Sequence, residues 1–245
     1  GRGFGTAGNQ RVAFYLLRQM RNAGLNTTVQ SFLSGGKVGH NVVGITPGWY
    51  TKYIVVGAYF DGLGFLDGEM YPGADSNASG VAALLSLARS LQKLATGNVG
   101  IIFVAFDGHN MAHSGAQAFF QRNRGIYDFR LMVNLDILGS TEVPVHKGRD
   151  AYLIALGGSY YRFGLENANR TESLDLSYDY YGSSAFTDLF YRKVSDQKPF
   201  LDAGIPCVMF TSGITMNTNK MTDTIETIDF PVLERRVSLI GKWLR

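Results

Sequence analysis

The amino-acid sequence predicts an α/β fold, with a largely parallel or mixed sheet and helices on both of its faces. Segments with the apolar spacing of a helix alternate along the chain with short segments typical of strands. The run VGIIFVAF, residues 99–106, contains no polar side chain, as expected of a strand that is covered on both faces. Polar residues follow several of the predicted strands, and α/β sheets bind ligands at the carboxyl ends of their strands.

The first two helices are predicted from apolar residues that recur on one face. The first covers 8–25 and ends near Gly24. Its apolar face carries Ala13, Leu16, Leu17 and Met20. The second covers 79–95, with Ser79 or Asn77 as its N-cap.

Two shorter helices are expected at 116–122 and 160–168. The last helix has Asp229 as its N-cap and Pro231 in its first turn. Its apolar face consists of Phe230, Leu233, Val237, Ile240 and Leu244. Strands are expected at 40–48, 52–60, 99–106, 131–138, 151–157 and 205–213.

Length and composition limit the function classes. The chain has 245 residues and neither an internal repeat nor a Pro/Ser-rich linker, so we expect one domain over 1–245. The net charge of +3 and the lack of a basic run with aromatics argue against nucleic acid as a partner. Because Cys207 is the one cysteine, an internal disulfide and a multi-cysteine metal site are excluded, and we expect a buried thiol.

No apolar stretch approaches the roughly 18 residues that a membrane span requires. The chain opens with GRGFG, which reads like a sequence that follows a removed leader. We therefore expect an exported protein, either periplasmic or extracellular.

The polar residues that follow the strands should meet on one edge of the sheet. They belong to the strand ends Tyr59-Phe60-Asp61, Asp107-Gly108-His109-Asn110, Asn134 with Asp136, and Thr211-Ser212-Gly213. The loop YPGADSNASG leads into the helix at Ser79.

The segment AFDGHNMAHSG spaces His109 and His113 as in the zinc-protease motif H-E-x-x-H, with Asn110 in place of the glutamate. The segment directly follows a buried strand and contains Gly115, so a turn is expected rather than the helix that the motif needs. A zinc site made by this histidine pair is therefore disfavoured. His113 is expected at the surface or in support of its neighbours, and His40 and His146 are assigned no role.

Seven ordered motifs resemble the zinc exopeptidases of the bacterial leucine aminopeptidase and glutaminyl cyclase type. They are AYFDG, GADSNASG, AFDGHN with HSG, NLDILG, SDQKPF, GIP and NKMTDT, and the match as a whole runs from about Asn41 to Asp229. The resemblance implies a three-layer α/β sandwich with a central mixed, mostly parallel sheet. It also implies a two-zinc centre at the carboxyl edge of that sheet.

The positions that bind zinc in that family are mostly altered in this chain. The resemblance places them at Tyr59, Ser76, Asn110, Asp136 and Asn219, and of these only Asp136 keeps the family's ligand. His109 stands where the family has its catalytic glutamate, while the supporting Asp61 is retained. Since neutral Tyr, Ser and Asn side chains are poor zinc ligands, we expect no zinc or other cofactor and a polar pocket adapted to the absence of metal.

Further expectations concern single side chains. Aspartates at strand ends commonly accept hydrogen bonds from backbone N–H groups, which is the role expected of Asp61, Asp75 and Asp107. Asp196 and Asp223 are interpreted as similar loop organisers. The segment that carries Tyr178, Tyr180 and Tyr181 either borders a specificity pocket, as the resemblance implies, or is an irregular loop with ordinary packing.

Asp136 should be partly buried, so it is expected to accept a hydrogen bond from a nearby donor. The candidate donors are Tyr59, Ser76, Asn110 and, as the favoured partner, His109, whose pKa would then rise.

The leading functional hypothesis is a non-catalytic homologue whose metal-free cleft binds a peptide or another small ligand. One alternative is an active zinc-dependent aminopeptidase or glutaminyl cyclase with a rearranged metal site. Another is metal-free hydrolysis with His109 as the base, although the sequence offers no Ser or Cys nucleophile with an orienting partner.

Overall fold

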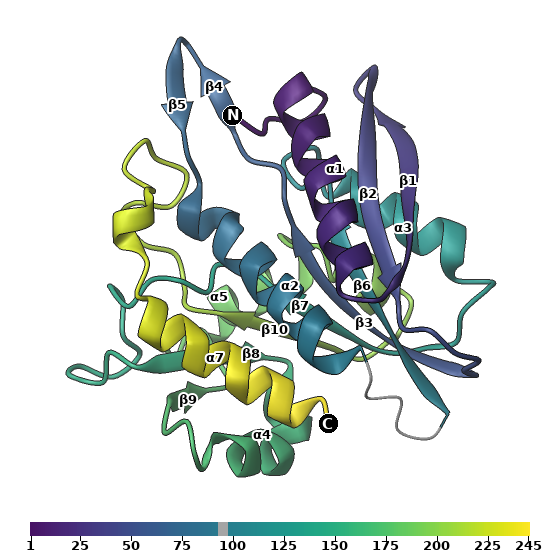
Figure 1. Cartoon of the computed structure of the whole chain (residues 1–245). Helices are drawn as coiled ribbons and strands as arrows, with labels where there is room; N and C mark the ends of the chain where they lie inside the picture. The colour runs from purple at the N-terminus through teal and green to yellow at the C-terminus, as the bar shows by residue number, and fades with distance from the viewer. Residues whose placement is uncertain (93–97) are drawn as a thin grey trace.

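The computed structural model describes residues 1–92 and 98–245. An eight-stranded sheet runs through it in the order β1-β2-β6-β3-β7-β10-β8-β9 (Figure 1). The bounds are β1 (Asn26–Ser34), β2 (Lys37–Ile45), β6 (Val99–Phe106), β3 (Lys52–Tyr59), β7 (Phe129–Leu135), β10 (Cys207–Thr211), β8 (Tyr152–Leu156) and β9 (Asp175–Ser177). Four of the seven strand pairs are parallel, which confirms the predicted mixed, mostly parallel sheet.

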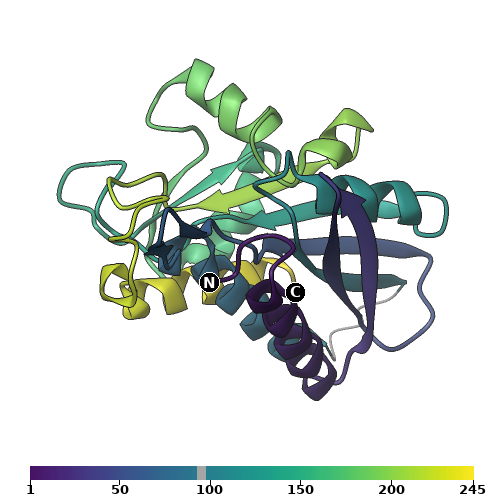
Figure 2. The same ribbon diagram turned by 90° about the horizontal axis from the view of Figure 1, so that it is seen from above.

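Helices cover both faces of the sheet, as Figure 2 shows from above. One layer consists of α1 (Ala7–Asn22), α2 (Gly80–Leu91), α4 (Arg162–Asn169) and α7 (Phe230–Trp243). The opposite layer consists of α3 (Ser114–Asn123), α5 (Ser184–Arg192) and α6 (Lys198–Asp202). The remaining elements are a separate hairpin of β4 (Gly64–Leu66) and β5 (Glu69–Tyr71) and the short helical segments η1 (Ala74–Ser79), η2 (Gly158–Tyr161) and η3 (Ile225–Thr227).

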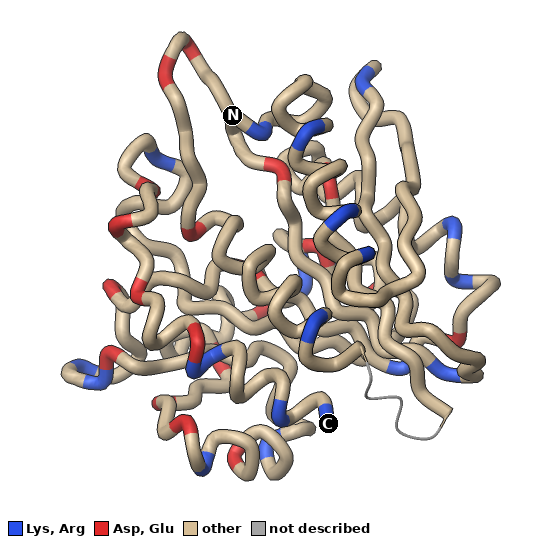
Figure 3. The backbone as a smooth tube through the Cα atoms, in the orientation of Figure 1, with Lys and Arg blue, Asp and Glu red and all other residues tan. Residues whose placement is uncertain are grey.

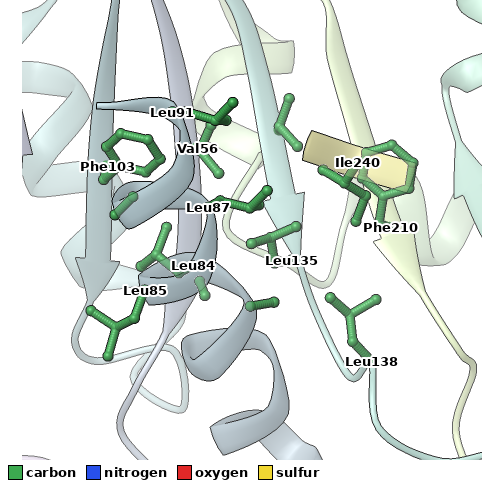
Figure 4. Close-up of a cluster of buried hydrophobic side chains, with 14 of the residues drawn as sticks. Val56, Leu84, Leu85, Leu87, Leu91, Phe103, Leu135, Leu138, Phe210 and Ile240 are labelled. Atoms are coloured by element: carbon green, nitrogen blue, oxygen red, sulfur yellow. The ribbon is translucent and has the colours of Figure 1, made fainter. Parts of the chain in front are cut away.

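The central strand β6 lacks polar side chains because both of its faces are buried. Along β6, Ile101 and Phe103 pack under α1, α2 and α7, while Ile102 and Val104 pack on the other side with α3. This alternation follows from the two-residue period of a strand. Figure 4 shows the first of these clusters, where the leucines of α2 meet side chains from β3, β6, β7 and β10.

Most predicted elements are confirmed, with small changes at their ends. The six predicted strands correspond to β2, β3, β6, β7, β8 and β10, and the predicted helices to α1, α2, α3, α4 and α7. Asp229 caps α7 by accepting a hydrogen bond from the Val232 N–H, and Asn77 Oδ1 accepts one from the Gly80 N–H at the start of α2. The second helix ends at Leu91, and residues 93–95 of that prediction lie outside the described residues.

The strands β1, β4, β5 and β9 and the helices α5 and α6 were not predicted. Neither β1 nor α5 contains a fully buried residue, so the apolar pattern that reveals an inner face is weak in both. Across the described part of the chain, no helix has both the length and the apolarity that a membrane span needs.

Candidate ligand-binding cleft

A cleft lies at the carboxyl ends of β3, β7 and β10, where the sequence predicted converging polar residues. It encloses about 240 Å³. Its polar wall is formed by Tyr59, His109, Asp136, Thr211, Thr218 and Asn219. Its apolar wall is formed by Ile137, Tyr180, Phe190, Val194, Met209 and Ile214. The cleft thus offers hydrogen-bonding groups to one end of a ligand and an apolar surface to the other.

His109 forms a buried ion pair at the base of this cleft. Its Nδ1 lies 2.8 Å from Asp196 Oδ2, and the two side chains are 17% and 0% exposed. The ring also stacks on Tyr59, with centroids 3.7 Å apart and planes 11° apart. Burial by itself would lower the pKa of His109, but the charge and hydrogen bond of Asp196, with the charges of Asp136 and Asp61, raise it to about 9. The imidazole is therefore a cation at neutral pH.

The prediction that Asp136 accepts a hydrogen bond from Tyr59, Ser76, Asn110 or His109 is wrong. Among the side chains that the structure describes, it is Ser195 that donates to this carboxylate, from Oγ to Oδ2 at 2.5 Å. His109, which was the favoured partner, is bound by Asp196 instead. The pKa of His109 is raised as expected, but chiefly by Asp196, and Asp136 contributes only through its charge at longer range.

The segment Ser195-Asp196-Gln197 explains this difference. Its three side chains are buried and meet the ends of β6 and β7: Ser195 bonds to Asp136, Asp196 to His109, and Gln197 Oε1 accepts from Asn134 Nδ2 at 2.7 Å. Asp196 was interpreted as a loop organiser, so this role was missed. The motif SDQKPF was the available signal for this role. Its first three residues are polar, and three successive polar side chains can all be buried only if polar groups in the interior bond to them.

The other altered positions are also bonded to neighbouring polar groups. Ser76 Oγ donates to Asn219 Oδ1 at 3.4 Å. Asn110 Nδ2 donates to Asp61 Oδ2 at 3.2 Å, and its side chain borders a separate cavity rather than the cleft. Of the five positions, Tyr59, Asp136 and Asn219 line the cleft, Ser76 touches its edge through Asn219, and Asn110 lies apart.

The aspartates expected to accept backbone N–H groups do so. Asp61 accepts from His109 and Asn110, Asp75 from Gly139, and Asp107 from His40 and Gly108. Asp223 accepts from the N–H groups of Asp75 and Ser76, so the loop-organising role predicted for it is confirmed as well. Burial raises the pKa of both Asp61 and Asp75 to about 6.

The structure also tests what the sequence predicted for the segment with two histidines, for the cysteine and for the tyrosine-rich segment. Residues 109–113 form a turn, and α3 starts only at Ser114. His113 is half-buried, with its ring edge-on to His109 at 4.9 Å between centroids. Cys207 is a buried free thiol, and burial raises its pKa. Tyr180 lines the cleft, whereas Tyr178 and Tyr181 border a different cavity.

The side chains at these five positions, four of them altered, do not fit a zinc pair. They supply one carboxylate, two amides, one hydroxyl and one phenol, and the pKa of Tyr59 is raised by burial and by nearby carboxylates, which keeps the phenol neutral. His109, which also lines the cleft, is already bonded to Asp196 through Nδ1. No group of three or more His, Cys, Asp or Glu side chains within 1–92 and 98–245 is arranged to hold a metal ion.

Comparison with known proteins confirms the resemblance to zinc exopeptidases. The sequence profile described as peptidase family M28 matches residues 41–244. The LapA aminopeptidase of Legionella pneumophila has a TM-score of 0.79 at 16% identity, and the match covers 99% of this chain and 66% of that protein, just under two thirds of its length.

Two further solved structures are similar to this chain. BSAP, a zinc aminopeptidase from Bacillus subtilis, has a TM-score of 0.78 at 15% identity, with 99% of this chain and 89% of BSAP covered. Porphyromonas gingivalis glutaminyl cyclase has a TM-score of 0.72 at 19% identity, with coverages of 99% and 91%. These likenesses establish the common fold.

Proposed function

The chain belongs to peptidase family M28, and we propose that it is a non-catalytic member whose cleft binds a peptide or another small ligand without a metal ion. We further propose that residues 1–245 act as one domain and that the protein is exported. Limited proteolysis that released a stable fragment would contradict the first of these two statements, and recovery from the cytoplasmic fraction of source cells would contradict the second.

The observation that carries the proposal is the buried pair of His109 and Asp196. The resemblance puts His109 at the position of the family's catalytic base, and a base must be unprotonated to accept a proton from water. With its pKa raised to about 9, His109 is protonated at neutral pH and cannot take that role. The same cation disfavours the metal-free alternative, in which His109 is the base.

The two walls of the cleft support a peptide-like ligand. Asp136, Asn219 and Thr218 can hydrogen-bond to a polar chain end, while Tyr180, Phe190 and Met209 can cover an apolar side chain. A volume of about 240 Å³ is enough for one or two residues and too small for a long segment.

We expect short peptides to bind in the cleft and to remain uncleaved. Aminoacyl anilides and N-terminal glutaminyl peptides should not turn over above background with zinc added, because the donor set and the protonated His109 both oppose catalysis. Binding should appear as NMR chemical-shift changes at residues of the cleft. An Ile214→Arg variant, which places a charge at the apolar wall, should lose those changes.

Turnover would contradict this proposal, and two variants would then identify its source. Loss of turnover in Asp136→Asn would point to a zinc-dependent exopeptidase or glutaminyl cyclase that uses the one retained ligand. Turnover that survives this change but not His109→Ala would point to hydrolysis without metal. An exposed Asp150→Asn change serves as the matched control for Asp136→Asn.

A further inference from the structure

The charges of the chain are distributed very unevenly along its length. Residues 1–60 contain six of its 23 Lys and Arg residues and none of its 20 Asp and Glu residues. Figure 3 shows the consequence, since α1 and the β1–β2 hairpin carry Lys and Arg only. A surface of one charge sign indicates an interaction partner of the opposite sign.

The exposed side of α1 combines this charge with aromatic rings. Arg11, Phe14, Tyr15 and Arg18 follow the spacing of one helical face, which we call the α1 face. Phe14 is 68% and Tyr15 47% exposed. Among the described residues, neither Arg11 nor Arg18 lies within ion-pair distance of a carboxylate. The α1 face is therefore a basic and aromatic surface that nothing within the described chain neutralises.

The β4–β5 hairpin has the complementary character. It stands apart from the main sheet and projects from the body of the molecule (Figure 1). Phe65 is 62%, Leu66 44% and Met70 38% exposed, and the acidic side chains of Asp67 and Glu69 lie between them at its tip. An isolated two-stranded hairpin is only marginally stable in water, so these apolar side chains would gain from a covering surface.

Helix α1 and the hairpin lie at the same edge of the molecule (Figure 1). Both border one cavity of about 570 Å³, to which α1 contributes Gly8 and Arg11 and the hairpin Phe65 and Leu66. Two adjacent and complementary elements on one edge are what a two-fold interface requires, since each element can then meet the other element of a second copy.

We propose that the partner is a second copy of this chain, and that the β4–β5 hairpin of each copy packs on the α1 face of the other. Asp67 and Glu69 then face Arg11 and Arg18, and Phe65 and Leu66 cover Phe14 and Tyr15. The two-fold axis makes this contact twice. An anionic membrane is a poorer partner for this edge, because Asp67 and Glu69 would be repelled by it.

Sedimentation velocity of the full chain tests the proposal with two charge-reversing variants. One is Asp67→Asn/Glu69→Lys, in which asparagine suits the left-handed φ of 51° at residue 67. The other is Arg11→Glu/Arg18→Glu. The wild-type protein should be dimeric, and each variant alone should have a dissociation constant raised at least about tenfold. Raising NaCl from about 0.05 to about 0.5 M should weaken the wild-type dimer.

An equimolar mixture of the two variants should restore dimers, because a reversed hairpin then meets a reversed α1 face and the two unreversed elements meet each other. A control with the same charge change at exposed sites elsewhere, Asp150→Asn/Glu234→Lys, should dimerise like the wild type. Melting temperatures of all variants establish that they fold. A monomeric wild-type protein overturns the proposal, as does a mixture that stays monomeric. A wild-type monomer that co-sediments with phosphatidylserine vesicles also overturns it, and assigns the α1 face to a membrane.

Discussion

Replacing Arg236 with methionine is expected to lower the free energy of unfolding by about 4 kcal/mol. Arg236 lies on α7 with no exposed surface, and it donates hydrogen bonds to the carbonyl groups of Leu138, Ser140 and Tyr152 at 2.7–2.9 Å. Methionine fills a similar volume but leaves these buried carbonyls without a donor. Unfolding in guanidinium chloride, followed by circular dichroism, measures the loss.

Arg235→Met is the matched control, because it removes a cation from the same helix at a partly exposed position. Arg235 donates to the carbonyl groups of Glu172 and Ser173. In the variant, water can partly take the place of Arg235 as the donor to these carbonyls, so this change should cost about 1 kcal/mol. Equal losses in the two variants would mean that the buried guanidinium of Arg236 has no special importance for the fold.

Replacing Asp196 with asparagine is expected to lower the free energy of unfolding by about 2–3 kcal/mol at pH 7, since it removes the charge that holds His109 protonated. The pKa of His109 is about 9 in the folded protein, against an ordinary value of 6.5 for a histidine in an unfolded chain. A pKa raised by folding contributes stability that is complete below pH 6.5 and is lost as the pH rises through 9.

The difference between the wild-type protein and Asp196→Asn should therefore be large near pH 6.5 and close to zero near pH 10. Unfolding curves at several pH values across this window measure it. A His109→Gln variant keeps a hydrogen-bond donor for Asp196 without a titrating charge, so it should flatten the same pH dependence. A difference between wild type and Asp196→Asn that stays constant from pH 6.5 to 10 would rule out the ion pair as its cause.

The parts of the fold that the sequence predicted are those in which burial leaves a periodic pattern. In β6 both faces are buried, so the strand is recognisable from apolar residues alone, and in α7 the cap at Asp229 adds a local signal. The strand β1 lies at the edge of the sheet and α5 lies on its surface, so neither has a complete buried face. The Asp67-Gly68 turn is a usable signal for the β4–β5 hairpin, although the strands that it joins are too short to show a pattern of their own.

The candidate site likewise has contacts that the sequence predicted and contacts that it did not. Asp61, Asp107 and Asp223 accept backbone N–H groups, and this role follows from residue type and position at a strand or loop end, although it does not identify the partner. The pairing of His109 with Asp196 joins residues 87 positions apart. No local rule places them together, so the sequence assigned His109 to Asp136, the one carboxylate left among the family's ligand positions.

Arg236 shows a signal that could have been used. It lies three residues after Leu233 and four before Ile240, which places it beside the apolar stripe of α7. A charged residue at such a position is buried only if carbonyl or carboxylate groups receive it, and the loop after β7 supplies two of the three carbonyls. Those acceptors are brought to Arg236 by the tertiary structure, which the sequence of α7 alone does not reveal.

The central claim is that this family fold has a cleft adapted to work without zinc, and diffraction at the zinc absorption edge tests it most directly. Crystals grown with excess zinc should give no anomalous peak among the side chains of Tyr59, Ser76, Asn110, Asp136 and Asn219. The amides and the neutral phenol are poor ligands for a divalent ion. A fully occupied zinc ion bound to these side chains at about 2.0–2.2 Å would contradict the account.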